Sequence, residues 1–203
     1  MGPNVWPGEH LIARDEFRAP LETYFAAVNA LAIRMLDLVA RTLPYGPDVF
    51  TEFVTGYVIA PLRVLHYPPA RPEVKKQLGA GAHTDFGAIT LLLQDGNPGL
   101  EVLHPLTGEF VPIEPTTGAF VFNVGDMLSA WTGGRYKSSV HRVINKNPVD
   151  RYSAAFFFDG SLDCPLDPLD GSGDPEGKGV LTVEKHMIKR ITDSYGKNTT
   201  ASK

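Results

Sequence analysis

Three side chains in this sequence have the types and spacing of a metal site. His83 and Asp85 are two residues apart, so both side chains project from one face if the segment is extended. His141 lies in a second strand-like run and could supply a third ligand. Two imidazoles and one carboxylate leave positions open on an ion such as Fe(II), which suits a chelating cosubstrate and O2. Taken singly, a hydrogen-bonded His-Asp pair and a structural strand histidine are the alternatives.

A candidate carboxylate-binding site follows ten residues after His141. Alternation along a strand puts Arg151, Ser153 and Phe157 on one face. If residues 145–150 form a hairpin turn, this strand pairs with the one that carries His141, and its guanidinium and hydroxyl lie close to the metal. A guanidinium there binds a carboxylate through charge-assisted hydrogen bonds, and Phe157 could wall the same cavity. The alternative is a cross-strand salt bridge beside core aromatic residues.

A third expected strand presents Arg63, Leu65 and Tyr67 on one face. The Tyr67 phenol could donate to an anionic ligand and Arg63 could be a second cationic anchor, although either residue could serve the structure alone. Arg63, Phe86 and Phe157 are the candidate lining of a substrate pocket. Such a lining suits a largely apolar small molecule with one polar or anionic group.

Hydrophobic periodicity predicts the elements that must position these residues. Apolar residues at helical spacing predict a helix over residues 21–43, and Thr182 is the expected N-cap of a last helix. Between residues 56 and 160, short β-branched and aromatic runs favour an antiparallel barrel or jelly roll. A hairpin connection is expected at residues 105–108. The strands are expected at residues 57–67, 87–93, 100–104, 110–113, 119–123, 138–144 and 151–159.

A length of 203 residues fits one domain with a sizeable core. No composition shift or linker divides the chain, so we expect a single domain over residues 1–203. Its parts are a helical lead-in (residues 1–50), a jelly-roll core (56–160), and a loop with a C-terminal helix (161–203).

Charge and composition exclude several classes of partner. A formal net charge of −4 gives no reason to expect nucleic acid or an anionic membrane. The longest apolar segment, residues 19–43, contains charged side chains that a bilayer tolerates poorly. The single cysteine, Cys164, cannot form an internal disulfide, which favours a reducing compartment. We therefore expect a soluble, cytoplasmic protein whose partner is a small molecule.

Five motifs in order carry a resemblance to a known family. The motifs are GAHTDFGAITLLLQD (residues 81–95), NVGD (123–126), WTGGRYKS (131–138), VHRV (140–143) and RYS (151–153). With these motifs in this order, the sequence resembles the Fe(II)/2-oxoglutarate-dependent dioxygenases of the isopenicillin N synthase-like group.

This resemblance implies a double-stranded β-helix, or jelly roll, with a helix packed against it from each end of the chain. It implies that the iron ligands are His83, Asp85 and His141. It implies that 2-oxoglutarate is bound by Arg151, Ser153 and Tyr67. The implied reaction uses Fe(II), 2-oxoglutarate and O2 to hydroxylate, desaturate or cyclise a small organic molecule, with release of succinate and CO2.

Two departures from the family keep other readings open. Many relatives have Asn-Tyr-Tyr-Pro where this chain has Leu65-His66-Tyr67-Pro68, so a polar contact near the cosubstrate is absent or comes from His66. Family members also usually carry a substantial region before the segment that matches residues 2–7. We therefore consider association with another chain, including a truncated, non-catalytic partner subunit. A related oxidase that does not use 2-oxoglutarate is the other alternative.

Overall fold

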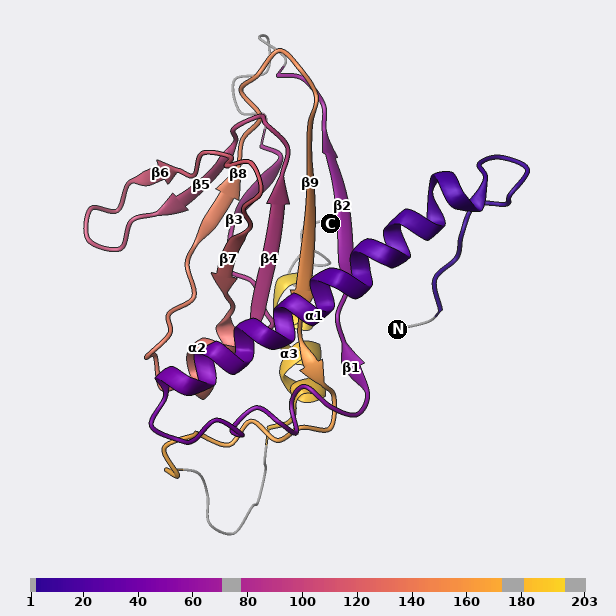
Figure 1. Cartoon of the computed structure of the whole chain (residues 1–203). Coiled ribbons are helices and arrows are strands. Elements are labelled where there is room, and N and C mark those ends of the chain that lie inside the picture. The colour runs from indigo at the N-terminus through magenta and orange to yellow at the C-terminus, as the bar shows by residue number, and fades with distance from the viewer. Residues whose placement is uncertain (1–2, 71–77, 173–180, 196–203) are drawn as a thin grey trace, which may run out of the picture.

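The computed structural model describes residues 3–70, 78–172 and 181–195. Two four-stranded antiparallel sheets carry most of the strands (Figure 1). A third sheet consists of two short strands, β1 and β10. The strands are β1 (Val58–Ile59), β2 (Leu62–Tyr67), β3 (Ala80–His83), β4 (Ile89–Gln94), β5 (Leu100–Leu103), β6 (Phe110–Pro112), β7 (Val121–Val124), β8 (His141–Val143), β9 (Arg151–Phe158) and β10 (Gly160–Ser161).

The chain passes back and forth between the two large sheets. The first sheet has the strand order β2-β9-β4-β7, and the second has the order β3-β8-β5-β6. Consecutive strands therefore alternate between sheets, except for the β5–β6 hairpin, whose turn at residues 105–108 was expected from the sequence. This arrangement is a double-stranded β-helix, so the mainly β jelly-roll fold expected from the sequence is confirmed.

Alternate residues of strand β9 lie on two faces of the first sheet that have different surroundings. Phe156 and Phe158 are fully buried in the main core on the outer face of the first sheet. Arg151 and Ser153 are buried too, but they project from the opposite face. The face of the first sheet that points toward the second sheet is therefore polar at the end where Arg151 and Ser153 lie. A small apolar cluster that includes Tyr67 is buried beside these two residues.

The N-terminal helix α1 (Arg18–Thr42) covers the outer face of the first sheet (Figure 1). Its Phe25 ring packs edge-on against Phe156, with 5.5 Å between the ring centroids. Among the described residues α1 is the one helix long and apolar enough to cross a membrane, a test that the core helix of a soluble protein also passes. Its buried side chains pack into the main core: Val28, Ala32, Leu36, Val39 and Ala40.

Within the part of the chain that the structure describes, three shorter helical elements accompany α1. They are a 3-10 helix, η1 (Arg14–Glu16), and the helices α2 (Asp126–Trp131) and α3 (Val183–Tyr195). The backbone N–H of Lys185 donates to Oγ1 of Thr182 at 3.4 Å, which confirms Thr182 as the N-cap of α3. Val183 is fully buried, so the start of α3 is held against the core.

The structure corrects the predicted pairing of β8 with β9. Strand β8 pairs with β3 and β5, whereas β9 pairs with β2 and β4, so the two strands lie in different sheets. Residues 145–150 are therefore a crossover and not a hairpin turn. The buried side chain of Asn145 stabilises the crossover, because its Nδ2 donates to the carbonyl oxygens of Tyr67, Pro68 and Val149 and so connects the segment to the end of β2.

Other elements also differ from expectation, among them β3, β10 and η1, which were not predicted from the sequence. The strand expected over residues 57–67 is divided into β1 and β2 by Ala60 and Pro61, because proline has no N–H to continue a ladder. Helix α2 was not expected, because six residues are too few for a periodic pattern.

Candidate metal centre

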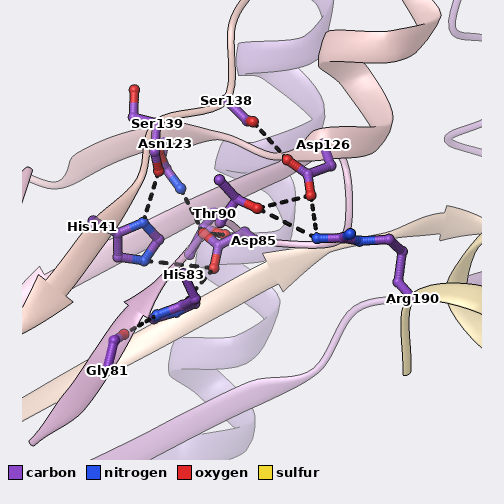
Figure 2. Close-up of polar contacts among 11 residues, drawn as sticks. Gly81, His83, Asp85, Thr90, Asn123, Asp126, Ser138, Ser139, His141 and Arg190 are labelled. Atoms are coloured by element: carbon purple, nitrogen blue, oxygen red, sulfur yellow. Dashed lines mark hydrogen bonds and ion pairs between the residues drawn. The ribbon is translucent and has the colours of Figure 1, made fainter. Parts of the chain in front are cut away.

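His83, Asp85 and His141 converge at the ends of β3 and β8, between the two sheets (Figure 2). His83 and His141 are direct partners in the β3–β8 pair, and their ring centroids are 4.3 Å apart. Oδ1 of Asp85 lies 3.9 Å from Nε2 of His83 and 3.7 Å from Nε2 of His141. One potential ligand atom from each residue lies within 4.8 Å of the other two, which is the spacing of a shared ion.

Hydrogen bonds orient both histidine rings toward the common centre. Nδ1 of His83 donates to the carbonyl oxygen of Gly81 at 2.7 Å, and Nδ1 of His141 donates to that of Ser139 at 3.1 Å. These bonds assign the proton to Nδ1 in each ring. The unprotonated Nε2 atoms are then free to bind a metal ion.

The two oxygens of the Asp85 carboxylate have different partners. Its Oδ2 accepts hydrogen bonds from Oγ1 of Thr90 at 2.7 Å and from Nδ2 of Asn123 at 2.6 Å. Its Oδ1 faces the two histidines. Asp85 is buried, so these two donors compensate for the loss of water around the charge. Two imidazole nitrogens and one carboxylate oxygen therefore form a donor set that fits a divalent ion.

Helix α2 holds the loop that carries Asp85. The backbone N–H of Asp126 donates to the carbonyl oxygen of Asp85 at 2.8 Å, and that of Gly125 donates to Ala88 at 2.8 Å. A Cβ on Gly125 would lie 2.1 Å from the carbonyl oxygen of Gly87. Only glycine therefore allows the two segments to approach this closely, which explains the glycine of the NVGD motif.

Arg151 is a fully buried cation with an unused donor. Its Nη2 donates to Oε1 of Gln94 at 2.8 Å and its Nε donates to the carbonyl oxygen of Asn97 at 3.2 Å. Its Nη1 is buried without a hydrogen-bond partner. Burial lowers the pKa of Arg151, and the nearby Tyr67 and Asp95 oppose that shift. A buried cation with a free N–H fits an anionic ligand such as a carboxylate.

The other predicted cosubstrate contacts lie close to Arg151. Tyr67 is its direct partner in the β2–β9 pair, and the Arg151 guanidinium carbon is 5.0 Å from the centroid of the Tyr67 ring. Ser153 is buried on the same face of β9. Leu65 pairs with Ser153, so an apolar side chain is the strand partner of this serine.

His66 does not supply the polar contact near the cosubstrate that was considered for it from the sequence. Its ring stacks on Tyr152 at 4.8 Å between centroids, and its Nε2 lies 2.6 Å from Oδ1 of Asp150. The His66 side chain is half exposed on the opposite face of β2 from Tyr67. The idea that His66 supplies the contact is therefore wrong, because strand alternation directs it away from the interior.

The three candidate substrate-pocket residues lie in different surroundings. Phe157 is half-buried and pairs with Thr90, next to the metal centre. Arg63 is exposed on β2, where it pairs with Ala155. Phe86 lies in the loop after Asp85, with the guanidinium of Arg190 4.8 Å from its ring centroid.

Comparison with known families tests what this arrangement means. The family model of the 2OG-Fe(II) oxygenase superfamily matches residues 59–160, half of the chain, and this stretch contains all three convergent side chains. The chain belongs to the 2OG-Fe(II) oxygenase superfamily.

Curated members of this superfamily are similar over nearly the whole chain. The 2-oxoglutarate-dependent dioxygenase citB of Monascus ruber is 55% identical over 199 residues, which are 96% of this chain and 60% of the relative. Clavatol oxidase claD of Penicillium crustosum is 48% identical over 96% of this chain and 59% of its own length. The chain thus spans about 60% of the length of these relatives.

Solved 2OG-Fe(II) oxygenases have the same fold. A full-length Neurospora crassa protein, solved in complex with alpha-KG, superposes with a TM-score of 0.81 at 31% sequence identity. The match covers 95% of this chain and 61% of that one. A 2OG-Fe(II) oxygenase family protein from Caulobacter crescentus superposes with a TM-score of 0.79, also at 31% identity, over 95% of this chain and 63% of that one.

Several residues of this oxygenase domain contribute to the site without having been singled out from the sequence. Thr90 and Asn123 bind Asp85, and Asn123 stands in the NVGD motif, which was a usable signal. Asp159 is buried against Gly87, and burial and the nearby Asp85 raise its pKa to about 7. Arg190 reaches the site from α3 through Asp126. No sequence spacing links Asp159 or Arg190 to the candidate metal ligands, because only the fold brings them together.

Proposed function

We propose that this chain, as a single domain, is a non-haem Fe(II)- and 2-oxoglutarate-dependent oxygenase that oxidises a small organic molecule. One observation carries the proposal: two Nε2 atoms and one carboxylate oxygen converge, and the remaining polar atoms of those three side chains are already hydrogen-bonded. A three-ligand set on one side of an ion leaves room for a chelating cosubstrate and O2. Superfamily membership supports iron as that ion.

His83, Asp85 and His141 are the proposed iron ligands. Bound Fe(II), together with 2-oxoglutarate and O2, supplies the oxidising chemistry, and 2-oxoglutarate leaves as succinate and CO2. The protein orients each imidazole through the hydrogen bond of its Nδ1 to a backbone carbonyl, so that Nε2 of each ring faces the ion. Thr90 and Asn123 hold Asp85 in place so that Oδ1 faces the ion.

Arg151, Ser153 and Tyr67 are the proposed contacts to the far carboxylate of 2-oxoglutarate. The free Nη1 of the buried Arg151 is the donor that such a carboxylate would satisfy. Gln94 and Asn97 fix the other side of the guanidinium, so its direction is set before the ligand arrives. Burial of Ser153 and Tyr67 beside it keeps water from the contact.

We propose Arg63, Phe86 and Phe157 as lining of the substrate pocket. The mixture suits a largely apolar small molecule with one polar or anionic group. Hydroxylation, desaturation and cyclisation are all compatible with this site, because the outcome depends on which substrate atom lies nearest the metal.

The finer family and cellular assignments are also proposals. The five sequence motifs support membership of the isopenicillin N synthase-like group. The net charge of −4 supports action without nucleic acid or an anionic membrane.

A cytoplasmic location is supported by the single cysteine, Cys164, which is buried and free, with its pKa raised by burial to about 11. Fluorescence of the tagged full-length protein in its own cells would test that location.

The decisive experiment is spectroscopic. Anaerobic addition of Fe(II) and 2-oxoglutarate to the wild-type chain should produce a charge-transfer absorption band. His83→Ala should abolish the band, whereas His104→Ala, at an exposed histidine beyond the end of β5, should retain it. A wild-type chain without the band and without metal-dependent 2-oxoglutarate binding would overturn the proposal.

A second measurement separates the alternatives. Succinate release in the presence of O2 supports the 2-oxoglutarate-dependent reaction, and oxidation of a substrate without succinate indicates a related oxidase. Size-exclusion chromatography with an assay of each fraction shows whether the isolated chain acts alone. Activity found only with a second chain would establish the partner-subunit reading.

A further inference from the structure

A single carboxylate, that of Asp126 at the start of α2, contacts both segments that carry the metal ligands (Figure 2). Its Oδ2 accepts a 2.8 Å hydrogen bond from Oγ1 of Thr84, which stands between His83 and Asp85 in the chain. Its Oδ1 accepts a 2.6 Å hydrogen bond from Oγ of Ser138.

Each of these two hydroxyl groups lies next to a group that orients a ligand. Ser138 precedes Ser139, whose carbonyl oxygen holds Nδ1 of His141. Thr84 precedes Asp85, whose carbonyl oxygen accepts the backbone N–H of Asp126 itself. The side chain and backbone of Asp126 therefore fix the two ligand-bearing segments relative to one another.

Arg190 of α3 completes this cluster from the C-terminal side. Its Nη2 lies 2.5 Å from Oδ2 of Asp126 and donates a 3.4 Å hydrogen bond to Oγ1 of Thr84. Its guanidinium carbon lies 4.8 Å from the ring centroid of Phe86, which follows Asp85. One cation thus contacts the residues on both sides of Asp85, Thr84 and Phe86, and also the Asp126 carboxylate that binds Thr84.

The ion pair between Arg190 and Asp126 is partly buried. The side chains of Arg190 and Asp126 are 32% and 23% exposed, so solvent screens their attraction less than that of an exposed pair. One turn earlier on α3, Nε2 of His186 donates to the carbonyl oxygen of Phe86 at 2.9 Å. Two side chains of α3 therefore hold the 84–86 segment from the same side.

We propose that Arg190 is a positioning residue for the metal centre, which acts through Asp126 and Thr84 and couples docking of α3 to the geometry of the ligands. The inference rests on the proposed function, because it requires that His83, Asp85 and His141 bind a metal ion. It assigns to the C-terminal helix a role beyond covering the core.

Loss of the guanidinium would leave the Asp126 carboxylate without its counter-charge and Thr84 without one hydrogen-bond partner. The Asp85 loop would then sample more than one position, while Thr90 and Asn123 would still hold the carboxylate itself. Loss of a partner that hydrogen-bonds a metal ligand directly typically lowers metal affinity by about 10- to 100-fold. Arg190 acts one contact further from the ligands, so we expect a loss at the lower end, roughly tenfold.

Co(II) titration of the metal-free full-length chain tests the proposal, with visible d–d absorption as the readout. Arg190→Ala should weaken Co(II) binding by roughly tenfold and change the shape of the d–d band at saturation. Arg190→Lys should recover part of the affinity, because it keeps the charge but loses the planar fork. Lys189→Ala, which removes an exposed charge from the same helix, should bind Co(II) as the wild type does.

The outcomes separate this inference from the proposed function. A wild-type chain that does not bind Co(II) overturns the proposed metal centre. A wild-type chain that binds it, with an Arg190→Ala variant of equal affinity and an unchanged band, overturns only the role of Arg190. An equal loss in Lys189→Ala would also overturn it, because a general charge effect would then suffice. If Arg190→Ala does not fold, as thermal unfolding of the metal-free chain would reveal, Arg190→Gln takes its place under the same criteria.

Discussion

Thr90 and Asn123 lie directly opposite each other in the β4–β7 pair, and both side chains donate to the same oxygen, Oδ2 of Asp85. Cross-strand partners in a sheet have side chains on one face, which is why two residues far apart in sequence can reach one atom. Their shared target leaves the other carboxylate oxygen facing His83 and His141. A pair of strands thus sets the direction of a candidate metal ligand.

Removal of the Thr90 hydroxyl should weaken metal binding with little change in packing. Thr90→Val keeps the shape of the buried side chain but leaves Oδ2 of Asp85 with one donor fewer. We expect a loss of metal affinity of about tenfold or more, measured by Co(II) or Fe(II) titration. Thr116→Val, at an exposed threonine between β6 and β7, is the control. Equal affinity of the two variants would contradict a role for Thr90.

Arg151→Lys should separate cosubstrate binding from metal binding. Lysine retains the charge but cannot donate to Gln94 and Asn97 while also presenting a free N–H to a ligand. The loss of charged hydrogen bonds, at about 1.5–3 kcal/mol, corresponds to roughly 10- to 100-fold weaker 2-oxoglutarate binding. Calorimetry with Mn(II) present would measure it, and Co(II) affinity should change less than about twofold. Unchanged 2-oxoglutarate affinity would exclude Arg151 as the carboxylate anchor.

Asp159 should make the metal-free protein less stable as the pH rises. Its pKa is raised from 3.8 to about 7 by burial and by Asp85, so the folded state retains a proton that the unfolded state releases. This contribution is fully present below pH 4 and is lost as the pH rises through 7. Each pKa unit corresponds to ~1.4 kcal/mol, so the total is at most a few kcal/mol.

Asp159→Asn tests this linkage because the amide cannot titrate. Urea unfolding in the presence of a chelator, at several pH values from 5 to 8, should show the stability of the variant gaining on that of the wild type as the pH rises. Parallel pH profiles for the two proteins would show that Asp159 ionises normally.

Docking of α3 should weaken in acid. Burial lowers the pKa of His186 below 6.5, partly opposed by the carbonyl oxygen of Phe86, so the unfolded state takes up a proton first as the pH falls. The stability that this histidine contributes is therefore lost as the pH drops below about 6.5. Hydrogen exchange of the amides of α3 at pH 5.5 and 7.5 would measure the change. His186→Gln keeps a donor but cannot titrate, so its α3 should show the smaller pH effect.

The candidate metal ligands and the fold class could be predicted from the sequence because strand periodicity and the ordered family motifs can both be seen along the chain. His83 and Asp85 are two residues apart, and the turn after β3 brings them to one centre. Alternation along β9 correctly separated Arg151 and Ser153 from Phe156 and Phe158. A period of two residues is a property of any extended strand, so it needs no knowledge of the partners.

Strand partners and remote contacts could not be predicted in this way. The sequence around residues 145–150 has the composition of a tight turn, yet Asn145 connects it to the end of β2 and β9 lies in the other sheet. Arg151 therefore reaches the interior from the sheet that faces His141, and not from a neighbouring strand.

What the sequence by itself determined is which residues could bind a metal and a carboxylate, and that their strands have two unlike faces. Only the tertiary structure decided which atoms hold those residues in place: Thr90 and Asn123 on Asp85, and Asp126 and Arg190 around the ligand loop. The physical reason is that a ligand's chemistry belongs to its side chain, whereas its direction depends on hydrogen bonds from segments that meet only when the sheets pair and α3 docks.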